Sequence, residues 1–177
     1  MRNPAYDMTN SPAHEHKHDA PRSLNCMVIT CSDTRTPETD TSGQLILKLL
    51  ERQGHKIVAY HVVKDDPGQI THCISLGTFK HAAQILIVNG GTGISRRDST
   101  FEAIDSMLEK RLDGFGEIFR YLTYQEIGSP AMMSRATAGV VDGCVIFSVP
   151  GSEHAVRLAM EKLILPELGH LVKELTK

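Results

Sequence analysis

Asn89-Gly90-Gly91-Thr92-Gly93-Ile94-Ser95-Arg96-Arg97-Asp98-Ser99-Thr100 is a glycine-rich stretch between an apolar run, residues 85–88, and a segment of helical periodicity, residues 101–112. A short apolar run that ends at glycines is typical of a buried strand leading into a loop. Glycine has no Cβ, so its backbone N–H group can turn inward and approach a ligand closely. Because such groups beside the start of a helix favour anions, the sequence predicts a strand, an anion-binding loop and a helix in succession.

Two common phosphate-binding motifs do not fit this stretch. The Walker motif needs Lys followed by Ser or Thr after its last glycine, and the dinucleotide motif needs a third glycine where this chain has Arg96. Arg96 and Arg97 add positive charge, and Asp98 supplies a carboxylate for a metal or a hydrogen-bond donor. A strand-to-helix turn without any ligand is the alternative interpretation of these residues.

Length and composition narrow the class of protein. The 177 residues suit a flexible tail over residues 1–23, which are polar and rich in proline, followed by one α/β domain over residues 24–177. The net charge is −2, from 19 basic and 21 acidic residues. The sequence has no long basic run, so binding of nucleic acid is not favoured. No apolar run reaches the roughly 18–20 residues of a membrane span, and the first 23 residues lack the apolar segment of a secretory signal. We therefore expect a cytoplasmic protein that binds neither nucleic acid nor membranes, with its four dispersed cysteines reduced in the core.

The hydrophobic pattern alternates between strands and helices along most of the chain. We expect strands at 24–31, 56–63, 83–89, 136–141 and 144–149, and helices at 41–53, 69–81, 101–112, 117–127, 153–165 and 168–175. Glycines 114 and 116 are expected to separate two helices, and Asp142-Gly143 between two apolar runs predicts a hairpin. The fold class predicted is α/β, with a doubly wound, mainly parallel sheet, helices on both faces and one antiparallel hairpin near the C-terminus.

Ligands of such sheets bind at the carboxyl ends of the strands. Five polar segments are expected to meet at that edge: residues 32–43, 65–66, 90–98, the region after 114, and 150–152. The edge then holds N–H donors, hydroxyls, arginines and carboxylates, without a spacing that suggests a covalent nucleophile. Such a set suits a phosphorylated ligand with a divalent cation, which Asp65 and Asp98 could hold as Mg²⁺. Capping of a helix would explain residues 40–42, and so would binding of the ligand at the same helix start.

Five motifs together resemble one protein family. Residues 90–100 resemble the Gly-Gly-Thr-Gly…Arg-Asp-Val-Thr signature of the MoaB/MogA family of molybdenum cofactor biosynthesis proteins, with Ser99 in place of the more usual valine. The other blocks follow the family order: Asp40-Thr41-Ser42-Gly43, Gly114-Phe115-Gly116-Glu117, Ser134-Arg135-Ala136 and Val149-Pro150-Gly151-Ser152. The resemblance covers residues 24–177, and residues 115–128 are closer to the MoaB branch.

The resemblance implies a doubly wound α/β fold that binds molybdopterin, usually as a homotrimer or homohexamer. MogA-type members transfer AMP from ATP to the terminal phosphate of molybdopterin and release pyrophosphate, and a molybdate-inserting enzyme then takes the adenylylated product. By the resemblance, Asp65 and Asp98 are the catalytic residues and the ligands of Mg²⁺ with ATP. The remaining implied binding residues are Asp40, Ser42, Gly43, Gly90, Gly91, Thr92, Gly93, Ser95, Glu117, Ser134, Pro150, Gly151 and Ser152. Weaker candidates for anion partners are Arg96, Arg97 and Arg120.

Three functions are open on the sequence. The first is molybdopterin adenylyltransferase, which both retained aspartates favour. The second is a non-catalytic molybdopterin-binding or carrier protein of the same pathway, because some MoaB proteins lack the transferase role. The third is a nucleotide-binding oligomer unrelated to molybdenum. Apolar positions over residues 116–127 exceed what a monomer surface normally exposes, and they predict an oligomer.

Overall fold

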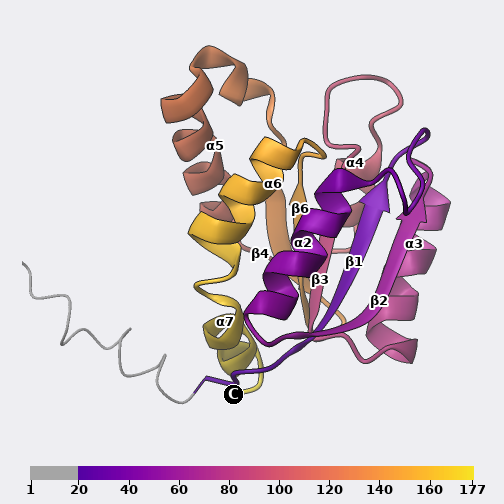
Figure 1. Ribbon diagram of the computed structural model, residues 1–177, viewed down its shortest axis with the longest axis vertical. Helices are drawn as coiled ribbons and strands as arrows, with labels where there is room; N and C mark the ends of the chain where they lie inside the picture. Colours follow the sequence, from indigo (N-terminus) through magenta and orange to yellow (C-terminus); the bar gives the residue numbers. More distant parts are fainter. Residues whose placement is uncertain (1–19) are drawn as a thin grey trace, which may run out of the picture.

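The computed structural model describes residues 20–177, which form one mixed sheet with helices on both faces (Figure 1). The expected tail lies mostly outside the described residues. The strands are β1 (Asn25–Cys31), β2 (Lys56–Val63), β3 (Ile85–Asn89), β4 (Lys110–Arg111), β5 (Thr137–Val141) and β6 (Cys144–Val149). The helices are α2 (Thr41–Arg52), α3 (Pro67–Ser75), α4 (Thr100–Asp105), α5 (Asp113–Ile127), α6 (Glu153–Ala159) and α7 (Leu168–Leu175). Shorter helical turns are η2 (Leu76–Lys80), η3 (Ser129–Met133) and η4 (Met160–Ile164).

The sheet has the strand order β2-β1-β3-β6-β5-β4 and confirms the predicted fold class. β2, β1, β3 and β6 are parallel, whereas β5 is antiparallel to β6 and to β4. The predicted hairpin is present, and Asp142 and Gly143 both have positive φ, at 47° and 70°, as the favoured two-residue turn requires. The chain leaves β1 for β2 on one side and β3 lies on the other, so the strand order reverses beside β1, where ligands of such sheets bind.

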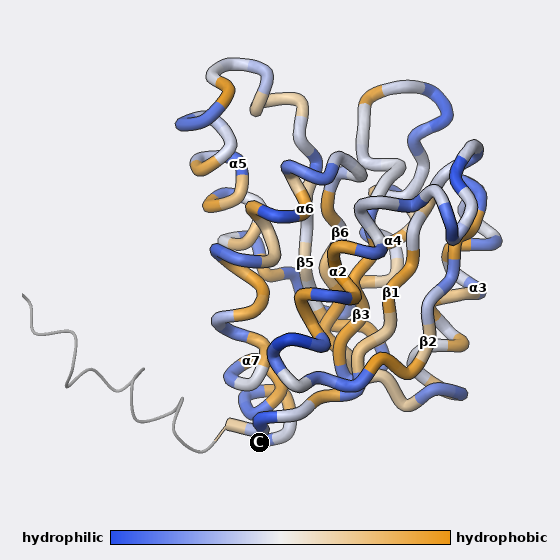
Figure 2. The backbone as a smooth tube through the Cα atoms, in the orientation of Figure 1, coloured by the Kyte–Doolittle hydropathy of each residue, from blue (hydrophilic) through white to orange (hydrophobic). Residues whose placement is uncertain are grey.

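Alternating side chains along the buried strands build two cores. Cys26 and Val28 of β1 pack with α2, α5, α6 and α7, whereas Met27 and Ile29 pack with α3 and α4. Figure 2 shows this apolar material concentrated in the strands, with hydrophilic segments prominent along the edge where the parallel strands end. The sheet is therefore covered on both faces, and its strand ends are left for polar chemistry.

The predicted helix at 101–112 is wrong in its second half, because α4 ends at Asp105. Lys110 and Arg111 instead pair with β5 as a short edge strand, and Leu108 packs over Gly139 of that strand. Leu108 therefore packs against a strand of the sheet, which the helical spacing of residues 101–112 does not predict.

The predicted break at glycines 114 and 116 is also wrong, because both residues lie within α5. A Cβ at Gly116 would lie 2.7 Å from the carbonyl oxygen of Ala136. Glycine is needed here for a close approach between α5 and the start of β5, not to end a helix.

The remaining elements agree with expectation to within a few residues, and the two ends of the described part, residues 20–177, lie at the same side of the molecule. The carbonyl oxygen of Pro21 packs against Gly169 of α7. Residue 20 and residue 177 both lie at the end of the molecule opposite the carboxyl ends of the parallel strands (Figure 1). No helix within residues 20–177 combines the length and the apolar character needed to cross a membrane.

Candidate functional site

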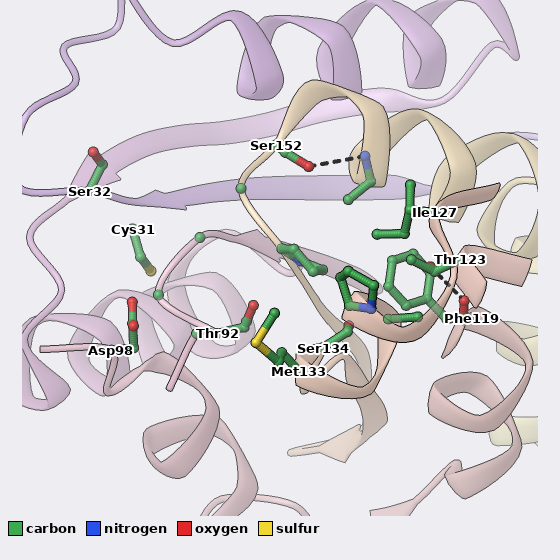
Figure 3. Close-up of a pocket in the computed structure, with 18 of the residues that line it drawn as sticks. Cys31, Ser32, Thr92, Asp98, Phe119, Thr123, Ile127, Met133, Ser134 and Ser152 are labelled. Atoms are coloured by element: carbon green, nitrogen blue, oxygen red, sulfur yellow. Dashed lines mark hydrogen bonds between the residues drawn. The ribbon is translucent and has the colours of Figure 1, made fainter. Parts of the chain in front are cut away.

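A cavity of about 630 Å³ opens at the carboxyl edge of the sheet, beyond the ends of β1, β3 and β6. This volume is typical of small-molecule sites, which span roughly 300–1,000 Å³. Its walls come from the β1–α2 loop, from residues 90–99 (the glycine loop), from the start of α6 and from residues 113–133 (the α5–η3 wall), as Figure 3 shows. The lining includes nine of the predicted binding residues: Gly90, Gly91, Thr92, Gly93, Asp98, Ser134, Pro150, Gly151 and Ser152.

The glycine loop passes close to the end of β1 and presents free N–H groups. Gly90 has a φ of 100°, and a Cβ there would overlap the carbonyl oxygen of Cys31, so both the conformation and the space require glycine. Among the described residues, the N–H groups of Gly91, Thr92 and Gly93 donate no hydrogen bond, although all three residues line the cavity. Unpaired N–H groups turned together make a concave site for an anion.

Asp65 and Asp98 both lie against the glycine loop, at different glycines. Asp65 Oδ1 accepts hydrogen bonds from the backbone N–H of Ser99 (3.1 Å), its hydroxyl (3.0 Å) and the hydroxyl of Thr100 (3.2 Å). Its Oδ2 faces Gly91. Asp98 Oδ2 accepts from the N–H of Ser95 at 2.9 Å, and a Cβ at Gly93 would lie 2.6 Å from the same oxygen. Asp98 lines the cavity, whereas Asp65 holds the base of the loop and is not part of the lining.

The two aspartates suit a magnesium ion that also binds a phosphorylated ligand. Within residues 20–177, no three His, Cys, Asp or Glu side chains gather as a metal site, so this part of the chain supplies no complete set of ligands. Asp65 Oδ2 and Asp98 Oδ1 accept no hydrogen bond from the described residues. Mg²⁺ is commonly held by one or two carboxylates plus phosphate oxygens and water, which fits this donor set.

Asp40 is a buried cap rather than a residue of the cavity lining. Its carboxylate accepts from the Gly43 N–H at the start of α2 (3.0 Å), from the hydroxyl of Thr30 (2.5 Å) and from that of Tyr60 (2.7 Å). Burial acts to raise the pKa of Asp40, but the hydrogen bonds from Thr30, Gly43 and Tyr60 outweigh it and hold that pKa below its usual value. Burial and the neighbouring Asp40 carboxylate raise the pKa of Tyr60, which therefore stays protonated as a donor.

Ser42 joins this buried cap to β3. Its one hydroxyl hydrogen is shared between Asp40 Oδ1 and Asn89 Oδ1, which each lie 3.0 Å from Ser42 Oγ, while the amide of Asn89 donates to the hydroxyl of Thr30 at 2.7 Å. Asp40, Ser42 and Gly43 do not line the cavity. Asp40 and Ser42 bind the ends of β1 and β3 beneath the cavity. The contacts of residues 40–42 are therefore those of a helix cap.

Arg35 connects the buried cap to the cavity, although it lies in none of the five sequence motifs. Its guanidinium donates to Asp40 Oδ1 at 3.3 Å and to the carbonyl oxygen of Gly151 at 3.1 Å, and it also donates to the hydroxyl of Ser42. Arg35 lines the cavity and is partly exposed there. A guanidinium held in place by a buried carboxylate is well oriented for an anion. The only sequence signal was its position five residues before the capping aspartate.

Arg135 holds the glycine loop from the other side and was noted only as part of a motif. Its Nε donates to the carbonyl oxygen of Thr92 at 3.1 Å, and its Nη2 donates to those of Gly93 and Asp98. Its Nη1 forms an ion pair with Glu102 of α4. The hydrogen bond from Arg135 lowers the pKa of that carboxyl.

The α5–η3 wall adds a mainly apolar side to the cavity. Its lining residues are Phe119, Thr123, Ile127, Pro130, Ala131 and Met133. Beside them, the buried hydroxyl of Ser134 has no hydrogen-bond partner among the described residues, although it lines the cavity. An apolar surface with one unpaired hydroxyl suits a flat heterocycle with polar edges.

Cys31 also lines the cavity, but its thiol is not a nucleophile. Burial raises the pKa of Cys31 to about 12, so the thiol stays protonated at neutral pH. All four cysteines are free and buried, as expected for reduced core residues.

Several predicted contacts lie outside the cavity lining. Glu117 is exposed on α5, and Arg120 donates to the carbonyl oxygen of Ala136. Ser95 is exposed in the glycine loop, where its backbone N–H binds Asp98. Arg97 is also exposed and forms a loose ion pair with Asp33 at 3.6 Å. These residues are thus less directly placed than the nine that line the cavity.

Comparison with known proteins gives one consistent result. A family model described as a probable molybdopterin binding domain matches residues 27–170. The chain is 53% identical over 164 residues to molybdenum cofactor biosynthesis protein B of Bacillus subtilis, covering 92% of this chain and 96% of that protein. A crystal structure of molybdenum cofactor biosynthesis protein B has a TM-score of 0.85 at 52% identity, covering 89% of this chain and 98% of that chain. That of the tungsten cofactor synthesizing protein MoaB from Pyrococcus furiosus has a TM-score of 0.82 at 36% identity, covering 89% and 100%.

Proposed function

Since this chain belongs to the MoaB/MogA family of molybdenum cofactor biosynthesis proteins and contains its molybdopterin-binding domain, we propose that it adenylylates molybdopterin with Mg²⁺–ATP. An oxygen of the terminal phosphate of molybdopterin attacks the α-phosphorus of ATP. The new P–O bond forms as the bond from the α-phosphorus to the bridging oxygen breaks, and pyrophosphate leaves with the negative charge. A molybdate-inserting enzyme then takes the product. Family membership removes the hypothesis of an oligomer unrelated to molybdenum.

The observation that carries this proposal is the meeting of two carboxylates and three free N–H groups on one loop. Gly91, Thr92 and Gly93 offer N–H donors to phosphate, while Asp65 and Asp98 contact the same loop. A phosphate nucleophile needs no general base, so catalysis requires mainly positioning and charge neutralisation. Asp65 and Asp98 would be the residues that hold Mg²⁺, which would supply neutralisation of the charge on the phosphates of ATP.

The other lining residues suit different parts of molybdopterin. The apolar α5–η3 wall and the hydroxyl of Ser134 suit the pterin rings, whereas Arg35 and the start of α6 suit its phosphate. Ser152 caps α6 through its hydroxyl, which accepts from the N–H of Ala155 at 3.2 Å, so its part in binding falls to the backbone.

The test is to incubate the protein with molybdopterin, ATP and Mg²⁺ and to measure pyrophosphate and adenylylated molybdopterin. We expect product from the wild-type protein and a loss of about 100-fold in kcat for Asp98→Asn and Asp65→Asn. Asp66→Asn is the matched control, since Asp66 neighbours Asp65 but caps α3, and Asn caps a helix as well as Asp does.

A second outcome identifies the alternative function. Molybdopterin affinity in the wild-type protein without any pyrophosphate release would identify a carrier that does not turn over ATP. Equal turnover by wild type and both aspartate variants would refute the roles of Asp65 and Asp98.

We propose further that the chain assembles as a homotrimer or homohexamer. Large exposed apolar side chains on the α5–η3 wall support this: Ile118, Tyr121, Tyr124, Ile127, Met132 and Met133. Tyr121, Tyr124 and Met132 line one apolar groove, whereas Ile127 and Met133 line the cavity. An exposed apolar groove of this kind is typical of a protein interface. Sedimentation of the wild-type protein should give a multiple of the monomer mass at micromolar concentration. Tyr121→Glu should lower the measured mass toward that of the monomer. A wild-type monomer would contradict the proposal.

A further inference from the structure

Arg135 makes an unusual number of contacts with the glycine loop. A guanidinium carries five N–H donors, and in Arg135 four of them are used, on the carbonyl oxygens of Thr92, Gly93 and Asp98 and on Glu102. Its Cζ also lies 5.0 Å from the centre of the Phe101 ring, at the start of α4. Arg135 itself does not line the cavity.

The carbonyl contacts fix how the loop presents its N–H groups. In a trans peptide the carbonyl oxygen of one residue and the N–H of the next point in opposite directions. Because Arg135 binds the oxygens of Thr92 and Gly93, the N–H groups of Gly93 and Ile94 point away from the guanidinium. Neither of these N–H groups donates to any described residue, and because Gly93 lines the cavity, its N–H stays available to a ligand there.

Little else holds the middle of the loop. The N–H of Asp98 donates to the carbonyl oxygen of Ser95 at 3.0 Å, and Ser95 donates back to the Asp98 carboxylate at 2.9 Å, so this turn is closed on itself. Residues 94–97 are exposed. Arg135 is therefore the side chain that ties the first half of the loop, at Thr92 and Gly93, to its second half at Asp98 and to α4 at Glu102.

We propose that Arg135 is the positioning residue of the glycine loop, holding its carbonyl groups so that its N–H groups are set for phosphate. This rests on the proposed function only in taking a phosphate group as the ligand of the loop. Lysine cannot replace the planar guanidinium of Arg135, because a single ammonium does not reach several separate carbonyl groups and Glu102 at once.

The experiment measures loop opening and phosphate binding separately. Arg96 and Arg97 are exposed in the loop, so trypsin under native conditions reports how often the loop opens. We expect cleavage after these two residues to accelerate about tenfold in Arg135→Gln, less in Arg135→Lys, and about threefold in Glu102→Gln, which keeps the carbonyl contacts. Arg111→Gln is the matched control, because Arg111 also pairs with a carboxylate of α4, Asp105 at 2.6 Å, but touches no loop residue.

Calorimetry with Mg²⁺–ATP and with pyrophosphate then tests the positioning role. In Arg135→Gln we expect affinity about tenfold weaker for both, with a melting temperature within a few degrees of wild type. Unchanged cleavage in a folded Arg135→Gln, or faster cleavage with unchanged affinity, would overturn the proposal, as would a wild-type protein that binds neither probe. Binding of the probes without adenylyl transfer would refute the proposed function but would not contradict the positioning role of Arg135.

Discussion

Asp40 and Asp98 lie at the same edge of the sheet and have opposite surroundings. Asp40 is fully buried and accepts from Thr30, Tyr60 and the start of α2, whereas the carboxylate of Asp98 accepts one hydrogen bond from its own loop. A carboxylate whose oxygens all accept hydrogen bonds from the protein has none free to bind a ligand. A carboxylate with a free oxygen beside unpaired N–H groups can bind one. The edge thus consists of a buried frame around Asp40 and a binding surface formed by the glycine loop with Asp98. Both aspartates belong to family motifs, so the sequence does not distinguish the two.

The largest effect expected from this division is on stability. Asp40→Ala should lower the free energy of unfolding by about 3 kcal/mol, because it removes the carboxylate that pairs with Arg35 and that accepts from the buried hydroxyls of Thr30 and Tyr60. Urea denaturation measures the loss, with Glu38→Ala at an exposed site two residues earlier as the control. A loss below about 1 kcal/mol would mean that the frame does not depend on this carboxylate.

A smaller effect concerns acid. Because the pKa of Asp40 is lowered in the folded protein, its stabilisation is fully present above the unfolded value of about 4 and is lost as pH falls through the folded value. The wild-type free energy of unfolding should therefore fall below about pH 4. In Asp40→Asn the slope should be shallower over the same range, as measured by urea denaturation between pH 3 and 6, and parallel slopes would argue against this origin.

The smallest effect is expected at Asp98. Asp98→Asn should change the free energy of unfolding by less than about 0.5 kcal/mol, because the side chain is partly exposed and an amide oxygen can still accept from Ser95. Thermal denaturation beside Asp40→Ala gives the contrast directly. A loss at Asp98 as large as that at Asp40 would remove the distinction between frame and binding surface.

Much of this architecture could be predicted from the sequence. The buried strands β3 and β6 appear as apolar runs that end at glycine or proline, and Asp142-Gly143 marks the hairpin, because these features depend on neighbouring residues alone. Residues 107–112 could not be assigned correctly in the same way. Their apolar spacing fits a helix face, and only the presence of β5 alongside determines that Lys110 and Arg111 form a strand.

The site shows the same limit. Glycines and aspartates were found because the loop and its motifs are continuous in sequence. Arg35 and Arg135 act through carbonyl groups 116 and 37–43 residues away, respectively, and no local pattern marks an arginine for such a contact. Gly116 predicts a helix break in the sequence, because the carbonyl of Ala136 that requires a glycine there comes close only in the tertiary structure.

Both ends of the described chain lie far from the cavity, with Pro21 packed against α7 and Lys177 at the same end of the molecule. A tether attached after Lys177 would therefore hold the protein on a sensor surface with the mouth of the cavity turned toward the solution. Immobilised in that orientation, the protein could be offered pterins and nucleotides in flow without the support obstructing their entry.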